Sequence, residues 1–250
     1  MSVSLRDRRR FDLRKTADCF VAPLMDCVEQ RLAESSKSLL VKACYDSDLF
    51  MITVDDRTEE FEIPVCDFLE RINELGGIDI DFIIEQRKHL EIDGTYCFDR
   101  DLDSSENDAP DVGIVCIWLY LPPGQLENSM IADIKRSLRG HIVHELQHVV
   151  QRLFYGSNYK ENNTIEYHID DIDEIDARLE EIIAMEDENS TVEQNIATFG
   201  ICLKRYAEQY LMRNDVTVDL PSYALLYDKI IENHMTAYRE KFLTGEDSAC

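Results

Sequence analysis

The sequence predicts an α+β fold, with strands mainly in the first half of the chain and helices in the second. Short apolar runs separated by turn-forming residues occupy the first 121 residues. From about residue 128 onward, apolar residues recur three or four positions apart over long stretches. With 250 residues, 44% of them hydrophobic, the chain can bury a substantial core. Strands followed by a run of helices are typical of the α+β class.

Short helices and strands are predicted in the first half. The runs with strand character span 38–44, 49–54, 89–98 and 113–121. The runs with helical spacing span 23–33, 65–75 and 82–87. The first helix is expected to begin at Pro23, because proline is tolerated at the first helical position. The strand over 89–98 is expected to be interrupted at Asp93-Gly94, and the acidic residues 99–111 are expected to form a loop.

Four helices are predicted in the second half, over 128–154, 170–185, 191–212 and 223–242. Asn128 is a good residue for the start of the first of them. We therefore divide the chain into an N-terminal extension of strands and short helices, residues 1–111, and a core with the C-terminal helices, residues 112–250.

The charge of the chain limits its partners. The 51 acidic and 26 basic residues give a formal net charge of −25, which repels phosphate backbones and anionic membrane surfaces. We therefore expect no nucleic acid to bind the acidic body. No run approaches the roughly 18 apolar residues needed to span a bilayer, so no membrane contact is expected. Residues 1–15 are basic and form either an arm that contacts an acidic partner or a solvated terminus.

The eight cysteines predict a reducing compartment. None forms a C-x-x-C pair, and most stand within apolar runs, as Cys116 does. The charged start of the sequence lacks the apolar stretch of a secretory signal. The cysteines are therefore expected to be reduced, and the protein to be cytoplasmic.

The segment His144-Glu145-Leu146-Gln147-His148 carries the strongest chemical signal in the chain. Two histidines four residues apart on a helix point in the same direction and can bind one zinc ion. Glu145 then lies beside the metal, where it can hold a zinc-bound water and accept its proton. The neighbours of these residues are uncharged, which suits a buried helix. His141, one turn earlier, is interpreted as structural.

A catalytic zinc ion needs a third protein ligand. The glycine and histidine that one zinc-peptidase class places after the second histidine are absent here. An acidic residue of the next helix, 170–185, is the expected source, and Glu174 is the leading candidate because it borders the apolar stripe of that helix. Asp170, Asp173 and His168 remain alternatives, and Asp170 is also a candidate to orient a zinc-bound histidine.

Residues 139–151, RGHIVHELQHVVQ, and 173–181, DEIDARLEE, resemble the small gluzincin-type zinc peptidases of phage and bacterial genomes. Those proteins carry an HExxH helix followed by a Glu-x-Glu/Asp-Ala helix. The resemblance covers roughly residues 113–185 and implies a zincin-like fold, with His144, His148 and Glu174 as zinc ligands and Glu145 as catalytic base. Asp176 stands where the family often has Glu.

The function expected from these features is that of a zinc-dependent peptidase. Zincins place a sheet-edge strand beside the metal, where a polypeptide substrate adds as a further strand. Residues 113–121 are a candidate for it, with a fully buried strand as the alternative. A group that stabilises the oxyanion is also expected, and the candidates are Tyr155, Tyr159, Tyr167, His168 and His234. The alternative function is that of a structural or assembly protein, for example a virion component, with a vestigial or stabilising zinc site.

Overall fold

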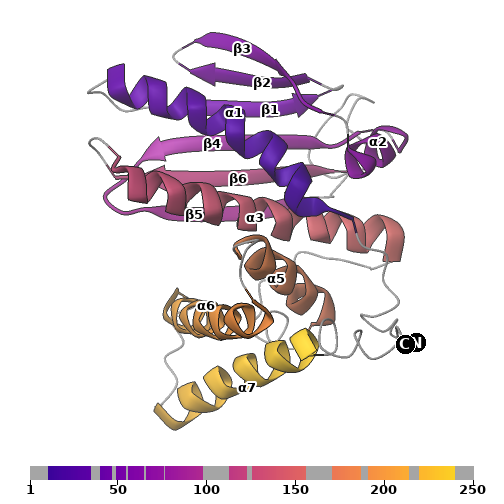
Figure 1. Ribbon diagram of the computed structural model, residues 1–250, viewed down its shortest axis with the longest axis vertical. Coiled ribbons are helices and arrows are strands. Elements are labelled where there is room, and N and C mark those ends of the chain that lie inside the picture. Colours follow the sequence, from indigo (N-terminus) through magenta and orange to yellow (C-terminus); the bar gives the residue numbers. More distant parts are fainter. Residues whose placement is uncertain are drawn as a thin grey trace.

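The structure, a computed structural model, has six helices and one six-stranded sheet in the part of the chain that it describes (Figure 1). It describes residues 11–34, 40–46, 49–54, 56–64, 66–75, 77–97, 113–122, 126–155, 171–186, 191–213 and 220–239. The helices are α1 (Leu13–Glu34), α2 (Asp67–Asn73), α3 (Asn128–Tyr155), α5 (Ile172–Ala184), α6 (Val192–Arg213) and α7 (Leu220–Tyr238). The strands are β1 (Val41–Asp46), β2 (Leu49–Val54), β3 (Arg57–Glu62), β4 (Asp79–Gln86), β5 (Glu91–Cys97) and β6 (Ile114–Leu121).

The six strands form one mixed sheet in the order β3-β2-β1-β4-β6-β5. Only β4 and β6 are parallel, and all other neighbours are antiparallel. Strand β6 is therefore internal, and the expectation that residues 113–121 form the edge strand is wrong. The edge position beside α3 belongs to β5, because the chain turns back after β4 and places β5 on the outer side of β6.

One face of the sheet carries the main hydrophobic core. Helices α1 and α3 lie side by side across this face (Figure 1). Strand residues alternate between buried side chains that point toward these helices and half-buried ones on the opposite face, as in β6 and β4. Phe20 of α1 is fully buried against the rings of Tyr45, Phe50 and Phe82, which come from three different strands. The chain thus positions α3, which carries the HExxH segment, by packing it on the sheet.

Two helix predictions in the first half need correction. Residues 82–86 lie in strand β4, because the run is flanked by β1 and β6 and alternates in burial, and Arg87 follows the end of that strand. A short apolar run fits either a helix or a strand, and pairing with neighbours decides between them. Helix α1 begins at Leu13, ten residues before Pro23, which lies inside the helix. The buried Ala17, Phe20 and Val21 extend its apolar face over the sheet. The exposed strand β3 has no apolar alternation and was not expected.

Helices α5, α6 and α7 enclose a second core below the first (Figure 1). Leu179 of α5, Phe199 and Leu203 of α6 and Ile230 of α7 are buried in it. Helix α5 also packs along α3, so it is the element that joins the two cores. The expected loop over 99–111 and the proposed boundary at 111/112 lie outside the described residues. In the described part of the chain, no helix has both the length and the apolar character that crossing a membrane requires.

The position of Phe20 predicts a large loss of stability on truncation. Phe20→Ala removes a fully buried ring from the junction of α1 with three strands. We expect the free energy of unfolding to fall by about 3–5 kcal/mol, measured by urea denaturation. Leu40→Ala, at a side chain that is 48% exposed next to β1, is the control and should change it by less than about 0.5 kcal/mol. Equal effects of the two substitutions would contradict this account of the core.

Candidate metal centre

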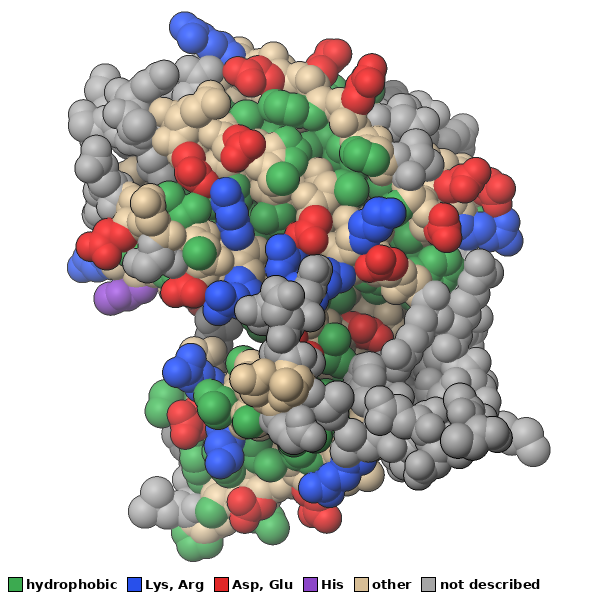
Figure 2. Space-filling model, viewed as in Figure 1, with side chains coloured by type: hydrophobic (Ala, Val, Ile, Leu, Met, Phe, Trp, Pro, Cys, Tyr) green, Lys and Arg blue, Asp and Glu red, His purple; other side chains and the backbone are tan. Residues whose placement is uncertain are grey.

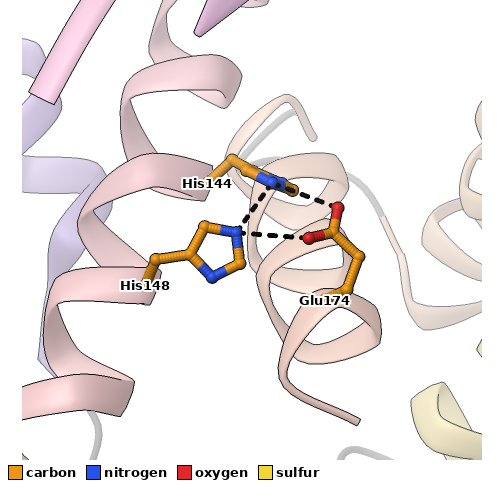
Figure 3. Close-up of side chains that lie close together, drawn as sticks. All are labelled: His144, His148 and Glu174. Carbon is orange, nitrogen blue, oxygen red and sulfur yellow. Dashed lines mark hydrogen bonds and ion pairs between the residues drawn. The ribbon is translucent and has the colours of Figure 1, made fainter. Parts of the chain in front are cut away.

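The HExxH segment lies in the middle of α3, where the helix is buried between the sheet and α5. Ile142, Val143 and Leu146 are buried in the main core. His144 and His148 project from the side of the helix that faces α5, and Glu174 projects toward them from α5 (Figure 3). The four-residue spacing on one helix thus places both imidazoles beside a carboxylate of another helix.

The three side chains converge closely. His144 Nε2 lies 3.2 Å from His148 Nε2. Glu174 Oε1 lies 3.4 Å from His144 Nε2, and Glu174 Oε2 lies 3.4 Å from His148 Nε2. All three residues are buried, and one ligand atom from each lies within 4.8 Å of the others. This group can hold a metal ion, because two ring nitrogens and one carboxylate are a usual ligand set.

The ring of His148 is oriented by Gln151, one turn further along α3. The Gln151 side-chain nitrogen donates to the backbone oxygen of Asp173 over 2.6 Å. This bond turns Gln151 Oε1 toward His148, and His148 Nδ1 donates to it over 2.8 Å. A proton on Nδ1 leaves the lone pair of Nε2 free to face Glu174 and a metal ion. The start of α5 therefore sets the tautomer of a histidine on α3.

The ring of His144 is oriented by a second carboxylate of α5. Glu181 Oε2 lies 3.1 Å from His144 Nδ1, so Nε2 faces Glu174 and His148. Burial works against the charged form of this imidazole, and so does Arg178, but the two carboxylates outweigh both and raise the pKa of His144 to about 10. A carboxylate behind a metal-binding histidine holds the ring in place and increases its basicity. Glu181 lies where it can orient His144 in this way.

Arg178 supplies the positive charge that the buried acids of α5 need. Glu174, Arg178 and Glu181 are spaced four and three residues apart, so they share one face of the helix. Arg178 pairs with Glu181 and lies 4.0 Å from Glu174 Oε1. Burial alone would raise the pKa of Glu181, but Arg178 and the nearby histidines hold the pKa well below its usual range. The guanidinium also lies 4.0 Å from the ring centre of Tyr206 on α6.

Glu145 lies against the edge strand rather than among the three ligand candidates. It is buried, and a Cβ atom at Gly94 of β5 would stand 2.9 Å from its Oε1 and 3.0 Å from Ile117 Cδ1. A side chain at Gly94 would therefore force these neighbours to shift, and Gly94 does not interrupt the strand, which runs through it. Burial raises the pKa of Glu145, which makes its carboxylate a stronger proton acceptor than an exposed one.

The three ligand candidates and Glu145 all line one cleft of about 680 Å³. Its walls are six consecutive residues from Leu90 to Thr95, the middle of α3, one face of α5, and α6 from Cys202 to Tyr210. Figure 2 shows a notch between the sheet-bearing part and the lower helices, at the left of the view. The cleft thus lies between the two cores, and Glu174 and Glu145 face it from different elements.

The other candidates have different outcomes. Asp170, Tyr167, His168 and Tyr159, and the side chain of Tyr155, lie outside the described residues. Asp173 contributes its backbone oxygen to Gln151. His234 is fully buried on α7, where its Nδ1 donates to the backbone oxygen of Ile230 over 2.9 Å, and burial lowers its pKa to about 4. It does not line the cleft.

Four residues of the site were not found from the sequence: Gln151, Arg178, Glu181 and Tyr206. Glu181 and Arg178 had a usable signal, because they repeat the helical spacing from Glu174 along the same face of α5. Tyr206 had no such signal, because it lies on a different helix, α6, and meets Arg178 only through the packing of α6 against α5. Burial raises the pKa of the Tyr206 hydroxyl to about 12, so it remains a proton donor on the cleft wall.

No protein-family model, curated protein or solved structure matches the chain.

The geometry predicts that Glu174 is required for metal binding. Glu174→Gln keeps the shape of the side chain but removes the charge that faces both histidines. We expect the affinity for a divalent zinc probe to fall by more than about 100-fold, measured against a competing chelator, because changes outside the ligand set already cost about 10–100-fold. Glu180→Gln, on the same helix but outside the cleft, is the matched control. Equal affinities of the two variants would exclude Glu174 as a ligand.

Metal affinity should also depend on pH. A metal ion can bind His144 only after the ring loses its proton, and the pKa of His144 is raised to about 10. Below that pH one proton leaves on binding, so we expect affinity to rise about tenfold per pH unit between about pH 6 and pH 8. Calorimetry in buffers of different ionisation enthalpy should report release of about one proton. Affinity that does not change with pH would contradict the protonated state assigned to His144.

Proposed function

We propose that the protein is a zinc-dependent peptidase of zincin-like, gluzincin type, with His144, His148 and Glu174 as ligands and Glu145 as catalytic base. One observation carries this proposal: a buried His-His-Glu group and a separate glutamate line the same cleft. The edge of the sheet forms one wall of that cleft. Each feature has a part in peptide hydrolysis, and each comes from a different element of the fold.

Zinc is the metal that suits this ligand set. Zinc binds histidine nitrogen and carboxylate oxygen at about 2.0–2.1 Å in tetrahedral geometry, which sets neighbouring ligand atoms about 3.3 Å apart. The three atom pairs here are 3.2, 3.4 and 3.4 Å apart. Three protein ligands beside an accessible cleft are typical of a catalytic site, whereas structural sites have four. When bound, zinc lowers the pKa of water and polarises a carbonyl group.

Glu145 has the position and the acidity for proton transfer. Its carboxyl group is buried against Gly94 at the cleft wall, one residue after His144. As carboxylate it accepts a proton from the attacking water, and as carboxylic acid it donates that proton to the leaving amine. The pKa of Glu145 is raised by burial, which strengthens the carboxylate as the acceptor of the first proton. On the opposite wall, Tyr206 is a hydroxyl donor suited to stabilising an oxyanion.

The edge of β5 suits an extended polypeptide. Residues Leu90 to Thr95 all line the cleft, although successive side chains of a strand point to opposite faces. Their shared feature is the backbone edge, which therefore faces the cleft. Among the described residues no further strand pairs with this edge. A substrate segment that adds to β5 would pass Gly94 and so bring a peptide bond next to Glu145.

The alternative is a structural or assembly protein with a stabilising zinc ion. The position of the three ligand candidates between two cores supports it, because an ion there would hold α5 against α3. The two functions differ in their need for Glu145, which a stabilising site would not use.

The decisive experiment combines metal content with cleavage. Glu145→Gln should retain about one zinc ion per chain and lose about 10²–10⁴-fold in the rate of cleavage of an unfolded protein substrate. Glu180→Gln is the matched control and should keep both properties. His148→Ala should lose the ion. Zinc-loaded wild type without cleavage would favour the structural alternative, and unchanged zinc content in His148→Ala would exclude the site.

A further inference from the structure

Asp93 and Trp118 lie next to each other on the sheet face opposite α3, at the cleft. They form a directly opposed pair across β5 and β6. Ile92 and Tyr96 of β5 are buried on the α3 side, as is Ile117 of β6, and Gly94 meets Glu145 there. Side chains alternate along a strand, so Asp93 and Trp118 must point to the other face. Both line the cleft, and Asp93 is exposed.

The pairing rule of sheets relates this pair to a substrate strand. Directly opposed residues of neighbouring strands point to the same face. The substrate residue opposite Gly94 would therefore point to the side of Glu145. Its neighbour, opposite Asp93, would point to the other face and extend the row formed by Trp118 and Asp93. The register thus places one specific substrate side chain beside a carboxylate and an indole.

A lysine or arginine side chain fits this position best. Its charged end can pair with the Asp93 carboxylate, and its length allows it to reach the face of Trp118 across the short aspartate. Among the described residues, the Asp93 carboxylate accepts one hydrogen bond, from the following backbone N–H of Gly94 over 3.0 Å. The nearby cation Arg87 lies 3.5 Å from the ring centre of Tyr120, which is opposite Glu91 and not Asp93.

We propose that Asp93 and Trp118 form a subsite for a lysine or arginine side chain of the polypeptide substrate, one residue from the position at Gly94. This inference rests on the proposed peptidase function, because it assumes that a substrate strand adds to β5. It extends that function by naming the substrate class as polypeptides with a basic residue next to the site of cleavage.

The binding test uses the full chain with Glu145→Gln, loaded with zinc, so that peptides bind without cleavage. The probes are three labelled peptides without tryptophan that alternate threonine with lysine, glutamine or glutamate. We expect the lysine peptide to bind about 2- to 5-fold more tightly than the glutamine peptide and the glutamate peptide to bind most weakly. Trp118 is the only tryptophan of the chain, so its fluorescence should change with the lysine peptide and report contact at this subsite.

The variants separate a local effect from the charge of the whole protein. Asp93→Lys should reverse the order of the lysine and glutamate peptides. Glu60→Lys makes the same change of charge on β3, the opposite edge strand, and should leave the order unchanged. Trp118→Leu should weaken binding of the lysine peptide more than that of the glutamine peptide. The same preference in Asp93→Lys as in Glu60→Lys would overturn the subsite.

Cleavage of the same peptides by the wild type distinguishes this inference from the proposed function. Glu145-dependent cleavage with no effect of Asp93→Lys on the relative kcat/KM values would overturn the subsite and leave the peptidase function intact. Binding that depends on Asp93, with no cleavage of any peptide by the zinc-loaded wild type, would support the subsite as a binding site and contradict the peptidase function.

Discussion

The contact between α3 and α5 buries an unusual amount of charge. Glu174, Arg178 and Glu181 from one helix meet His144 and His148 from the other, and Glu174, Glu181 and His148 are each no more than 3% exposed. Removing such groups from water is costly unless each is paired. Here Arg178 pairs with Glu181, and Glu174 faces both imidazoles. Because the partners come from both helices, the charges can be satisfied in only one relative position of the helices.

That position depends on small residues at the points of closest approach. A Cβ atom at Gly140 of α3 would lie 2.9 Å from Met185 Cγ and 3.2 Å from Glu181 Cγ. Ala177 of α5 is fully buried. On the other side of α3, Gly94 leaves the same kind of space for Glu145. The helix α3 is therefore held between the sheet edge and α5. Its two histidines face α5, whereas Glu145 faces β5.

The cleft exists because α5 belongs to two cores at once. Ile175, Leu179 and Ile182 pack with α6 and α7, whereas Glu174 and Glu181 face α3. Since the second core touches the first mainly through α5, the space between β5 and α6 remains open to solvent. A buried charged centre is thus joined to an accessible groove. Under the proposed function, this combination would bring a buried metal ion and an extended polypeptide together.

Regular spacing along single segments determined what the sequence could predict by itself. The positions of His144, Glu145 and His148 on one helix follow from their separation, and the apolar stripe of α5 makes Glu174 the leading candidate beside them. The other assignments required contacts between distant segments. The strand character of residues 82–86 depends on β1 and β6, and the edge position of β5 depends on how the chain returns after β4. The close approach at Gly94 involves Glu145 and Ile117 from other elements. Glu181 joins the site because it lies against His144 and Arg178, and Tyr206 joins it because its ring lies against Arg178. Periodicity is a local property of the chain, whereas strand order and buried charge pairs are decided by packing, and only the tertiary structure shows that packing.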